Sequence, residues 1–262
     1  MKQILLIFLS IILISCNNAS KKEENIKSER KNELEDKIDE YFSALNEMKK
    51  FNGVVFATQN DTLIINKAYN LNQDKSSTTY VTAESQFDIH SVSKLMAKYI
   101  IGKFEKEGKI KKNQTISNYI ENFPNGEKIT IDMLLNHTSG LPRSFEKTGD
   151  DFITLNSEEI IHLAKKQSLA FEPGTNVQYS NVAYEIVYFI IQEISQKSFA
   201  QCLNDEIFKP LKMLSSGAHF YDQNQNLNRL AKNHIKKDST IVQVDNILPS
   251  EFKTARIYST AK

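Results

Sequence analysis

The first part of the chain predicts one helix followed by a pair of strands. Apolar residues recur every third or fourth position from Leu34 to Phe51, which places them on one face of an amphipathic helix. Residues 53–58 and 62–69 are rich in apolar and β-branched side chains, and a short polar turn at 59–61 separates them. Two such runs around a tight turn predict an antiparallel hairpin.

The rest of the chain has mainly helical patterns. A helix is expected to begin at Ser91 and to stop before Gly108. Asn156 and Glu159 have the spacing of a capping box at the start of another helix. Apart from a short strand at 241–244, the pattern predicts almost no strand in the second half. The further helical segments are residues 129–135, 156–166, 181–196 and 199–208.

The N-terminal segment resembles an export signal. Lys2 precedes an apolar run at residues 4–14, and that run is shorter than the roughly 20 residues that a membrane-spanning helix needs. The sequence Leu-Ile-Ser-Cys at residues 13–16 is similar to a bacterial lipobox, which is cut before a cysteine that is then lipidated. A plain secretory signal, or a short buried helix, is the alternative.

Three parts of the chain follow from this pattern. We expect a lipoprotein signal over residues 1–16 with Cys16 as the lipidated residue, a flexible charged tether over 17–33, and one folded domain over 34–262. The protein would then be anchored to a membrane of the bacterial cell envelope, on the periplasmic face or at the cell surface. Export to the surface through the charged tract is a further possibility, although a solvated spacer explains the tract more simply.

Composition narrows the function classes. Hydrophobic residues make up 40% and charged residues 25% of the 262 residues, which is typical of a globular chain. Lys and Arg number 33 against 32 Asp and Glu, so no basic excess favours a nucleic acid. Two cysteines and 8 glycines argue against a disulfide framework and a phosphate loop. We expect a monomer that needs no metal or cofactor.

The first candidate motif is Ser91-Val92-Ser93-Lys94. Residues three apart lie on one face of a helix, so Ser91 in the first turn points the same way as Lys94. The helix N-terminus would favour an alkoxide-like nucleophile and an oxyanion beside it. A lysine amine acts as a base only when it is neutral, and burial favours the neutral form. The alternative is a capping serine followed by a surface lysine.

Two further motifs lie downstream. A positive charge nearby can lower the pKa of the Tyr179 phenol, which would make it a proton acceptor, and Asn181 can donate to a substrate carbonyl and accept from Lys94. The alternative is a turn before a helix, with Tyr179 in the core and Asn181 near the cap. His137, in the run of residues 136–142, is either a general base or a residue that fixes a tight loop, and we favour the second interpretation.

Taken together, the motifs resemble the serine β-lactamase-related family, which includes class C β-lactamases, DD-peptidases and esterases. The Tyr-x-Asn form separates this branch from class A enzymes, which carry S-D-N. Lys212 stands where a further family segment, I-F-x-P-L-G-M, has glycine. The resemblance begins at about Phe51 and continues to the last residue. The segments that carry it are residues 89–94, 134–142, 173–174, 179–181 and 207–213.

The resemblance implies a fold and a mechanism. The fold is α+β and β-lactamase/transpeptidase-like, with a helix-flanked antiparallel sheet, incomplete here, and an inserted helical domain. Ser91 would be the acylating nucleophile, Lys94 and Tyr179 would move its proton, and Asn181 would orient the substrate. The reaction would be acyl-enzyme formation and hydrolysis of an amide, an ester or a β-lactam, in a small molecule or a cell-wall peptide.

The resemblance also has a gap. The family's third motif, K-T-G or H-x-G, would follow residues 259–262, and the only K-T-G, at 147–149, stands in the wrong order and is read as coincidence. The missing strand would carry an oxyanion donor, whose loss costs about 10²–10³ in rate. A chain of this length is therefore expected to be weakly folded and nearly inactive. The alternative function is a truncated, non-catalytic lipoprotein or pseudoenzyme.

Overall fold

The computed structural model describes residues 28–71, 75, 80–145, 156–218, 229–237, 240–244 and 257–262. The chain separates into two compact units, one formed by Met1–Ser85 with Ala261–Lys262 and one formed by Gln86–Thr260. The predicted signal at 1–16 with Cys16, and the K-T-G at 147–149, lie outside the described residues. Within the described ranges, no helix is both long and apolar enough to cross a membrane.

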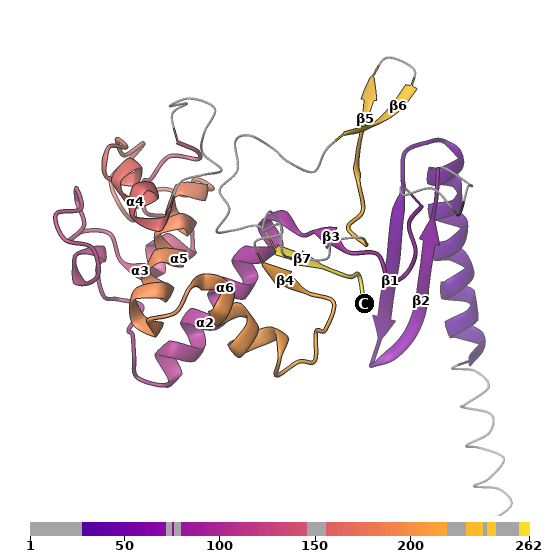
Figure 1. The fold of residues 1–262 in the computed structure, drawn as a ribbon, viewed down its shortest axis with the longest axis horizontal. Coiled ribbons are helices and arrows are strands. Elements are labelled where there is room, and N and C mark those ends of the chain that lie inside the picture. Colours follow the sequence, from indigo (N-terminus) through magenta and orange to yellow (C-terminus); the bar gives the residue numbers. More distant parts are fainter. Residues whose placement is uncertain are drawn as a thin grey trace, which may run out of the picture. The chain divides into compact units, whose positions relative to one another are not determined.

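The first unit contains the predicted helix and hairpin (Figure 1). Strands β1 (Gly53–Gln59) and β2 (Thr62–Tyr69) pair antiparallel, with a register shift between Ala57 and Thr58. Both turn residues have positive φ, 49° at Asn60 and 59° at Asp61.

 The left-handed conformation at both positions makes this a two-residue turn whose twist matches that of the strands. The predicted hairpin is therefore confirmed.

The helix of the first unit covers residues 28–47 of the described chain, so it begins before the predicted start at Leu34. Its first turns are polar and exposed, and an ion pair between Lys37 and Glu33 one turn apart, at 2.7 Å, supports them. Because these turns have no apolar face, the hydrophobic pattern does not predict them. The carboxylate of Asp39 accepts hydrogen bonds from Lys67 at 2.6 Å and Tyr69 at 2.8 Å, which ties this helix to β2.

The second unit contains strands that the hydrophobic pattern did not predict. Strand β7 (Ile257–Ser259) lies between β3 (Phe87–Asp88) and β4 (Gly217–Ala218), and both neighbours pair with it antiparallel. A second hairpin joins β5 (Asn233–Lys237) to β6 (Thr240–Val244), and β6 confirms the short strand predicted at 241–244. The expectation of almost no strand after the middle of the chain is wrong. Strands of two or three residues are too short to show alternation, and distant segments fix their pairing.

The helices of the second unit fall close to their predicted places. Thr130 caps α3 by accepting a hydrogen bond from the N–H of Met133 at 3.2 Å, and Asn156 and Glu159 form the predicted capping box of α4. The helices are α2 (Ser93–Lys106), α3 (Ile131–Leu135), α4 (Ser157–Lys165), α5 (Asn181–Ser195) and α6 (Phe199–Leu203), with 3-10 turns η1 (His90–Val92) and η2 (Ile116–Asn118) and a π-helical turn η4 (Asn204–Phe208).

Helix α5 is at the centre of the second unit and contacts α2, α3, α4 and α6 (Figure 1). Most of its side chains are buried, among them Ile186 and Ile190, and α2 packs Ala97, Ile100 and Ile101 into the same core. Burying each of these isoleucine side chains contributes about 1.5–3 kcal/mol. The core therefore fixes α2 and α5, the two helices whose N-terminal ends carry the predicted site.

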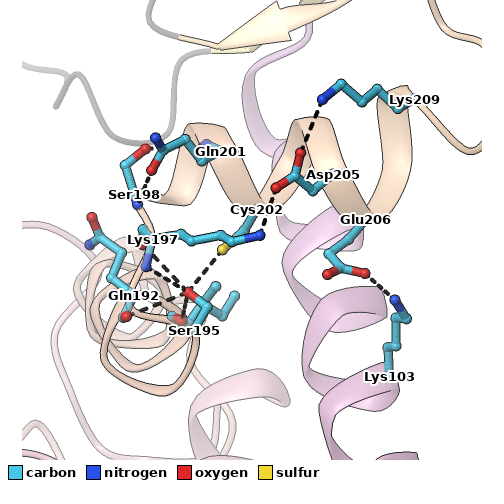
Figure 2. Close-up of polar contacts among 11 residues, drawn as sticks. Lys103, Gln192, Ser195, Lys197, Ser198, Gln201, Cys202, Asp205, Glu206 and Lys209 are labelled. Atoms are coloured by element: carbon cyan, nitrogen blue, oxygen red, sulfur yellow. Dashed lines mark hydrogen bonds and ion pairs between the residues drawn. The ribbon is translucent and has the colours of Figure 1, made fainter.

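Polar contacts fix the far ends of these helices (Figure 2). Lys103 of α2 forms an ion pair with Glu206 in η4, and Lys197 pairs with Asp205 at 2.7 Å. The thiol of Cys202 is buried and donates to Ser195 Oγ at 3.0 Å. Burial raises the pKa of this thiol, so it remains protonated at neutral pH.

The turn after η4 contains the residue that departs from the family segment. Lys212 has a φ of 56°, which is the left-handed conformation. This conformation is strained for a residue with a Cβ, whereas glycine adopts it freely. The backbone thus keeps the shape that glycine would favour, although lysine occupies the position.

Candidate active site

Ser91 lies in η1, directly before α2, and its side chain is exposed. The preceding residue, His90, has a φ of 43°, and its N–H donates to Asp88 Oδ1 at 3.0 Å. A side-chain oxygen that accepts from the backbone two residues on stabilises a tight turn. This turn presents Ser91 to solvent at the N-terminal end of α2.

Lys94 is in the first turn of α2 and faces Ser91, as the three-residue spacing predicts. Its Nζ donates to Ser91 Oγ at 3.3 Å. The same ammonium lies 5.1 Å from the ring centroid of Tyr179 and 5.3 Å from that of Tyr184. A cation within about 6 Å of a ring face is attracted to it, so the two rings hold the lysine head group next to the serine.

Tyr179 lies two residues before α5, and its hydroxyl donates to Ser91 Oγ at 2.8 Å. The structure therefore brings Ser91, Lys94 and Tyr179 together. Burial raises the pKa of the Tyr179 phenol, but its polar contacts with Lys94 and Ser91 and the charges of Lys94 and Arg143 more than offset burial, so the pKa lies below its usual value. This environment favours a tyrosine that can give up and take a proton.

Asn181 is the first residue of α5, and Ser180 caps the helix by accepting from the N–H of Ala183 at 2.9 Å. The N–H of Asn181 donates to the carbonyl of Arg143 at 2.9 Å. The Lys94 ammonium lies near two aromatic rings and against Ser91. The expectation that Asn181 accepts a hydrogen bond from Lys94 stays a prediction.

The loop at residues 137–143 positions the Tyr179 segment. Hydrogen bonds of 2.7–2.9 Å join its carbonyl groups to the segment 170–181. Because they recur along both segments, the loop fixes the backbone on each side of Tyr179. The donors are Ala170, Gly174, Gln178, Asn181 and the Ser180 hydroxyl, and the acceptors are Gly140, Thr138, His137, Arg143 and Pro142, respectively.

His137 belongs to this scaffold. Its Nδ1 accepts from the N–H of Ser180 at 3.1 Å, and its ring packs against Tyr179 with 4.5 Å between centroids. Burial lowers the pKa of His137, and the charges of Lys94 and Lys98 lower it further, so the ring is neutral at neutral pH. Within the described chain no hydrogen bond joins His137 to Ser91. The geometry favours the loop-fixing interpretation over a general base.

Gly140 is where the two segments come closest. Its φ is 80°, and a Cβ at this position would lie 2.2 Å from the carbonyl oxygen of Phe171. Both the backbone conformation and the close approach exclude a side chain here. Glycine thus allows the loop to pair with the segment that leads to Tyr179.

Two residues of the site have no signal in the sequence patterns. The guanidinium carbon of Arg143 lies 5.2 Å from the centroid of the Tyr179 ring. Tyr184 is a core residue of α5 and only 2% exposed, but its ring also contacts Lys94. Its hydroxyl donates to the carbonyl of Leu135 at 3.0 Å, and burial raises its pKa to about 12. The spacing of apolar residues predicts that α5 is buried, but it does not indicate which side chain each aromatic ring contacts.

This arrangement can carry out chemistry at one oxygen atom. Ser91 Oγ is exposed to a reactant and has an amine and a phenol within hydrogen-bond distance. A serine with groups that can take its proton is the arrangement used for nucleophilic catalysis. Among the described residues, no cluster of His, Cys, Asp or Glu side chains could hold a metal ion.

Comparison with solved structures shows which fold the chain has. FmtA from Staphylococcus aureus superposes with a TM-score of 0.73 at 24% identity, over 89% of this chain and 63% of that chain. A penicillin-binding protein from Bacillus halodurans gives 0.68 at 21% identity, over 83% of this chain and 68% of that one. The fold is the β-lactamase/transpeptidase fold, and the predicted α+β class is confirmed.

A family comparison identifies the chain more closely. The model of the Beta-lactamase family matches residues 38–262, and the chain belongs to this family. It is 28% identical over 199 residues to a protein named putative penicillin-binding protein PbpX from Bacillus subtilis, covering 76% of this chain and 48% of the relative. It is 29% identical over 167 residues to the protein Flp of Staphylococcus aureus, covering 61% of this chain and 33% of that protein. The chain thus spans half or less of the length of these relatives.

Proposed function

We propose that this protein is a serine hydrolase that acts through an acyl-enzyme on Ser91. The observation that supports the proposal most is the contact of Ser91 Oγ with Tyr179 at 2.8 Å and Lys94 at 3.3 Å. In the first step, Ser91 Oγ bonds to the substrate carbonyl carbon while its proton passes to the Tyr179 oxygen. That proton then goes to the leaving group as the acyl bond breaks, and water releases the acyl group from Ser91.

We assign the proton acceptor to Tyr179 in its deprotonated form, with Lys94 as the adjacent cation. The lowered pKa of Tyr179 supports this assignment. The Lys94 ammonium lies over two aromatic rings, and a ring face attracts such a cation. Loss of the phenol proton reverses the hydrogen bond, so that the serine hydroxyl donates to the tyrosine oxygen.

The substrate class follows from the chemistry of a serine acyl-enzyme. We propose an amide, an ester or a β-lactam as the acyl donor, from a small molecule or a cell-wall peptide, with Asn181 as the residue that orients it. Similar folds occur in a D-amino acid amidase from Ochrobactrum anthropi and in the hydrolase EstCE1, which has promiscuous acyltransferase activity. At 23% and 19% identity, these likenesses concern the fold and favour no single acyl donor.

A p-nitrophenyl ester tests the proposal through the burst of p-nitrophenol that accompanies acylation. The burst requires only acyl-enzyme formation, so it is visible even when hydrolysis is slow. We expect a burst from the unaltered chain and none from Ser91→Ala. Ser93→Ala is the matched control, since Ser93 is buried and its hydroxyl lies 3.3 Å from that of Tyr188, and it should keep the burst. A folded chain without a burst, or a burst from Ser91→Ala, would contradict the proposal.

We also propose that Cys16 carries a lipid and anchors the protein in the cell envelope. The proposal rests on the apolar run at residues 4–14 and on the cysteine at its end. An envelope location would bring the site close to cell-wall peptides.

A further inference from the structure

Arg143 is fixed beside the site by its own backbone. Its carbonyl accepts from the N–H of Asn181 at 2.9 Å, and the carbonyl of Pro142 accepts from the Ser180 hydroxyl at 2.7 Å. These bonds attach the end of the loop to the first turn of α5, one residue after Tyr179. The Arg143 side chain therefore starts from a defined point close to the phenol.

The guanidinium uses this position to cover Tyr179. Its central carbon lies 5.2 Å from the ring centroid, the distance of a cation–π contact. Lys94 lies 5.1 Å from the same centroid, so two positive groups face one ring. Arg143 is exposed, and no carboxylate of the described residues lies within ion-pair distance of it. Its charge therefore acts on Tyr179 without a neutralising partner among those residues.

We propose that Arg143 is a positioning residue for the proposed acyl transfer: its guanidinium holds the Tyr179 ring over Ser91 and supports the negative charge of the phenolate that takes the serine proton. This inference rests on the proposed function of Ser91 and assigns a role within it. Arg143 does not contact Ser91 in the described contacts, so it acts only through Tyr179.

The other groups that face Tyr179 define what Arg143 can add. Lys94 supplies the nearer positive charge, and neutral His137 packs against the ring. Tyr184 and Tyr188 stay protonated at neutral pH because burial raises the pKa of both. Lys94 and Arg143 are thus the groups whose charge favours the phenolate. Because Arg143 is exposed, solvent screens its charge, and the effect of removing it should be modest.

Titration of Tyr179 by NMR tests the proposal directly. Tyrosines labelled with ¹³C at Cζ in the full chain each report their own ionisation, and the signal that disappears in Tyr179→Phe identifies Tyr179. We expect Arg143→Gln to raise the apparent pKa of Tyr179 by about 0.3–1 pH unit, because a positive charge that favours the phenolate is lost. Arg143→Lys should restore at least half of that change. The unaltered chain and both variants should give the same signals for the other tyrosines.

A matched control removes an equal charge elsewhere. Arg229→Gln changes the net charge by the same amount, and Arg229 instead hydrogen-bonds Ser215 Oγ at 3.3 Å. This variant should leave the Tyr179 titration unchanged. An unchanged pKa in Arg143→Gln, equal changes in the Gln and Lys variants, or the same change in Arg229→Gln would each overturn the proposal. The titration needs no turnover, so a failure of the Ser91 burst remains distinguishable from a failure of this inference.

Discussion

At the scale of single residues, the central feature is the Ser91 hydroxyl and its two hydrogen-bond partners. Lys94 reaches Ser91 because three residues of helix place both on one face. Tyr179 comes from a distant part of the chain and makes the shorter contact. The amine is held between rings, while the phenol has a lowered pKa, so the two groups are suited to different parts in a proton transfer.

The Tyr179 phenol should determine how acylation depends on pH. A lowered pKa means that the phenolate forms at a lower pH than in an ordinary tyrosine, so the acylation rate should rise with pH through that pKa. Tyr179→Phe should reduce the rate by about 10²–10⁴ and remove this rise. Stopped-flow measurement of the p-nitrophenol burst between about pH 6 and pH 10 gives both quantities.

The control for this experiment is Tyr119→Phe, which removes a hydroxyl that donates to Gln114 Oε1 at 2.9 Å. Burial raises the pKa of Tyr119, so its ionisation falls above that of Tyr179. This variant should keep both the rate and the pH dependence. A Tyr179→Phe chain that acylates at the original rate, with the same rise, would show that another group takes the proton.

At the scale of elements, the loop at residues 137–143 acts as a support for the segment that carries Tyr179. The hydrogen bonds between them involve mostly backbone groups, so the support depends on backbone shape more than on side chains. Gly140 allows that shape, because its carbonyl accepts from the N–H of Ala170 at 2.8 Å and no Cβ obstructs Phe171. This support is the structural role of a run of polar and small residues that lies far from Ser91 in the sequence.

Gly140→Ala should disturb this support. The left-handed φ of 80° and the contact with the Phe171 carbonyl should together cost about 1–3 kcal/mol of folding free energy and slow the burst. Gly102→Ala is the matched control, since a Cβ at Gly102 meets nothing within 4 Å and the residue lies inside α2. That change should stabilise the chain by about 0.8–1 kcal/mol.

Urea unfolding followed by circular dichroism measures both changes in the free energy of unfolding. Opposite signs for the two glycines are expected. Equal effects would contradict the proposed role of Gly140 in the loop, because the two glycines differ only in their surroundings and in φ.

At the scale of the whole molecule, the sequence predicted what depends on local pattern. The Asn156–Glu159 capping box, the hairpin turn at Asn60 and Asp61, and the helices around the core have signals within a few neighbouring residues. Other contacts join residues far apart in sequence and produce no periodic pattern that could predict them. Examples are the pairing of β3 with β7 and the contact of Arg143 with the Tyr179 ring. The motifs identified Ser91, Lys94 and Tyr179, whereas their supporting residues required coordinates.

The proposed lipid anchor also belongs to the scale of the whole molecule. Growth of a bacterial host with an alkyne fatty acid should label the full chain through Cys16, and Cys16→Ser should lose the label. Cys202→Ser is the control, because this buried thiol should accept no lipid and the variant should stay labelled. Equal labelling of the unaltered chain and Cys16→Ser would contradict the anchor.

We propose above all that Ser91 forms a covalent acyl-enzyme. The mass of the peptide that contains Ser91 reports this covalent bond directly. The full chain is incubated with a fluorescent penicillin or a p-nitrophenyl ester, digested, and analysed by tandem mass spectrometry. We expect an added acyl mass on the hydroxyl of Ser91, absent from Ser91→Ala and strongly reduced in Tyr179→Phe. An adduct on another residue, or a folded chain that carries none with either reagent, would contradict it.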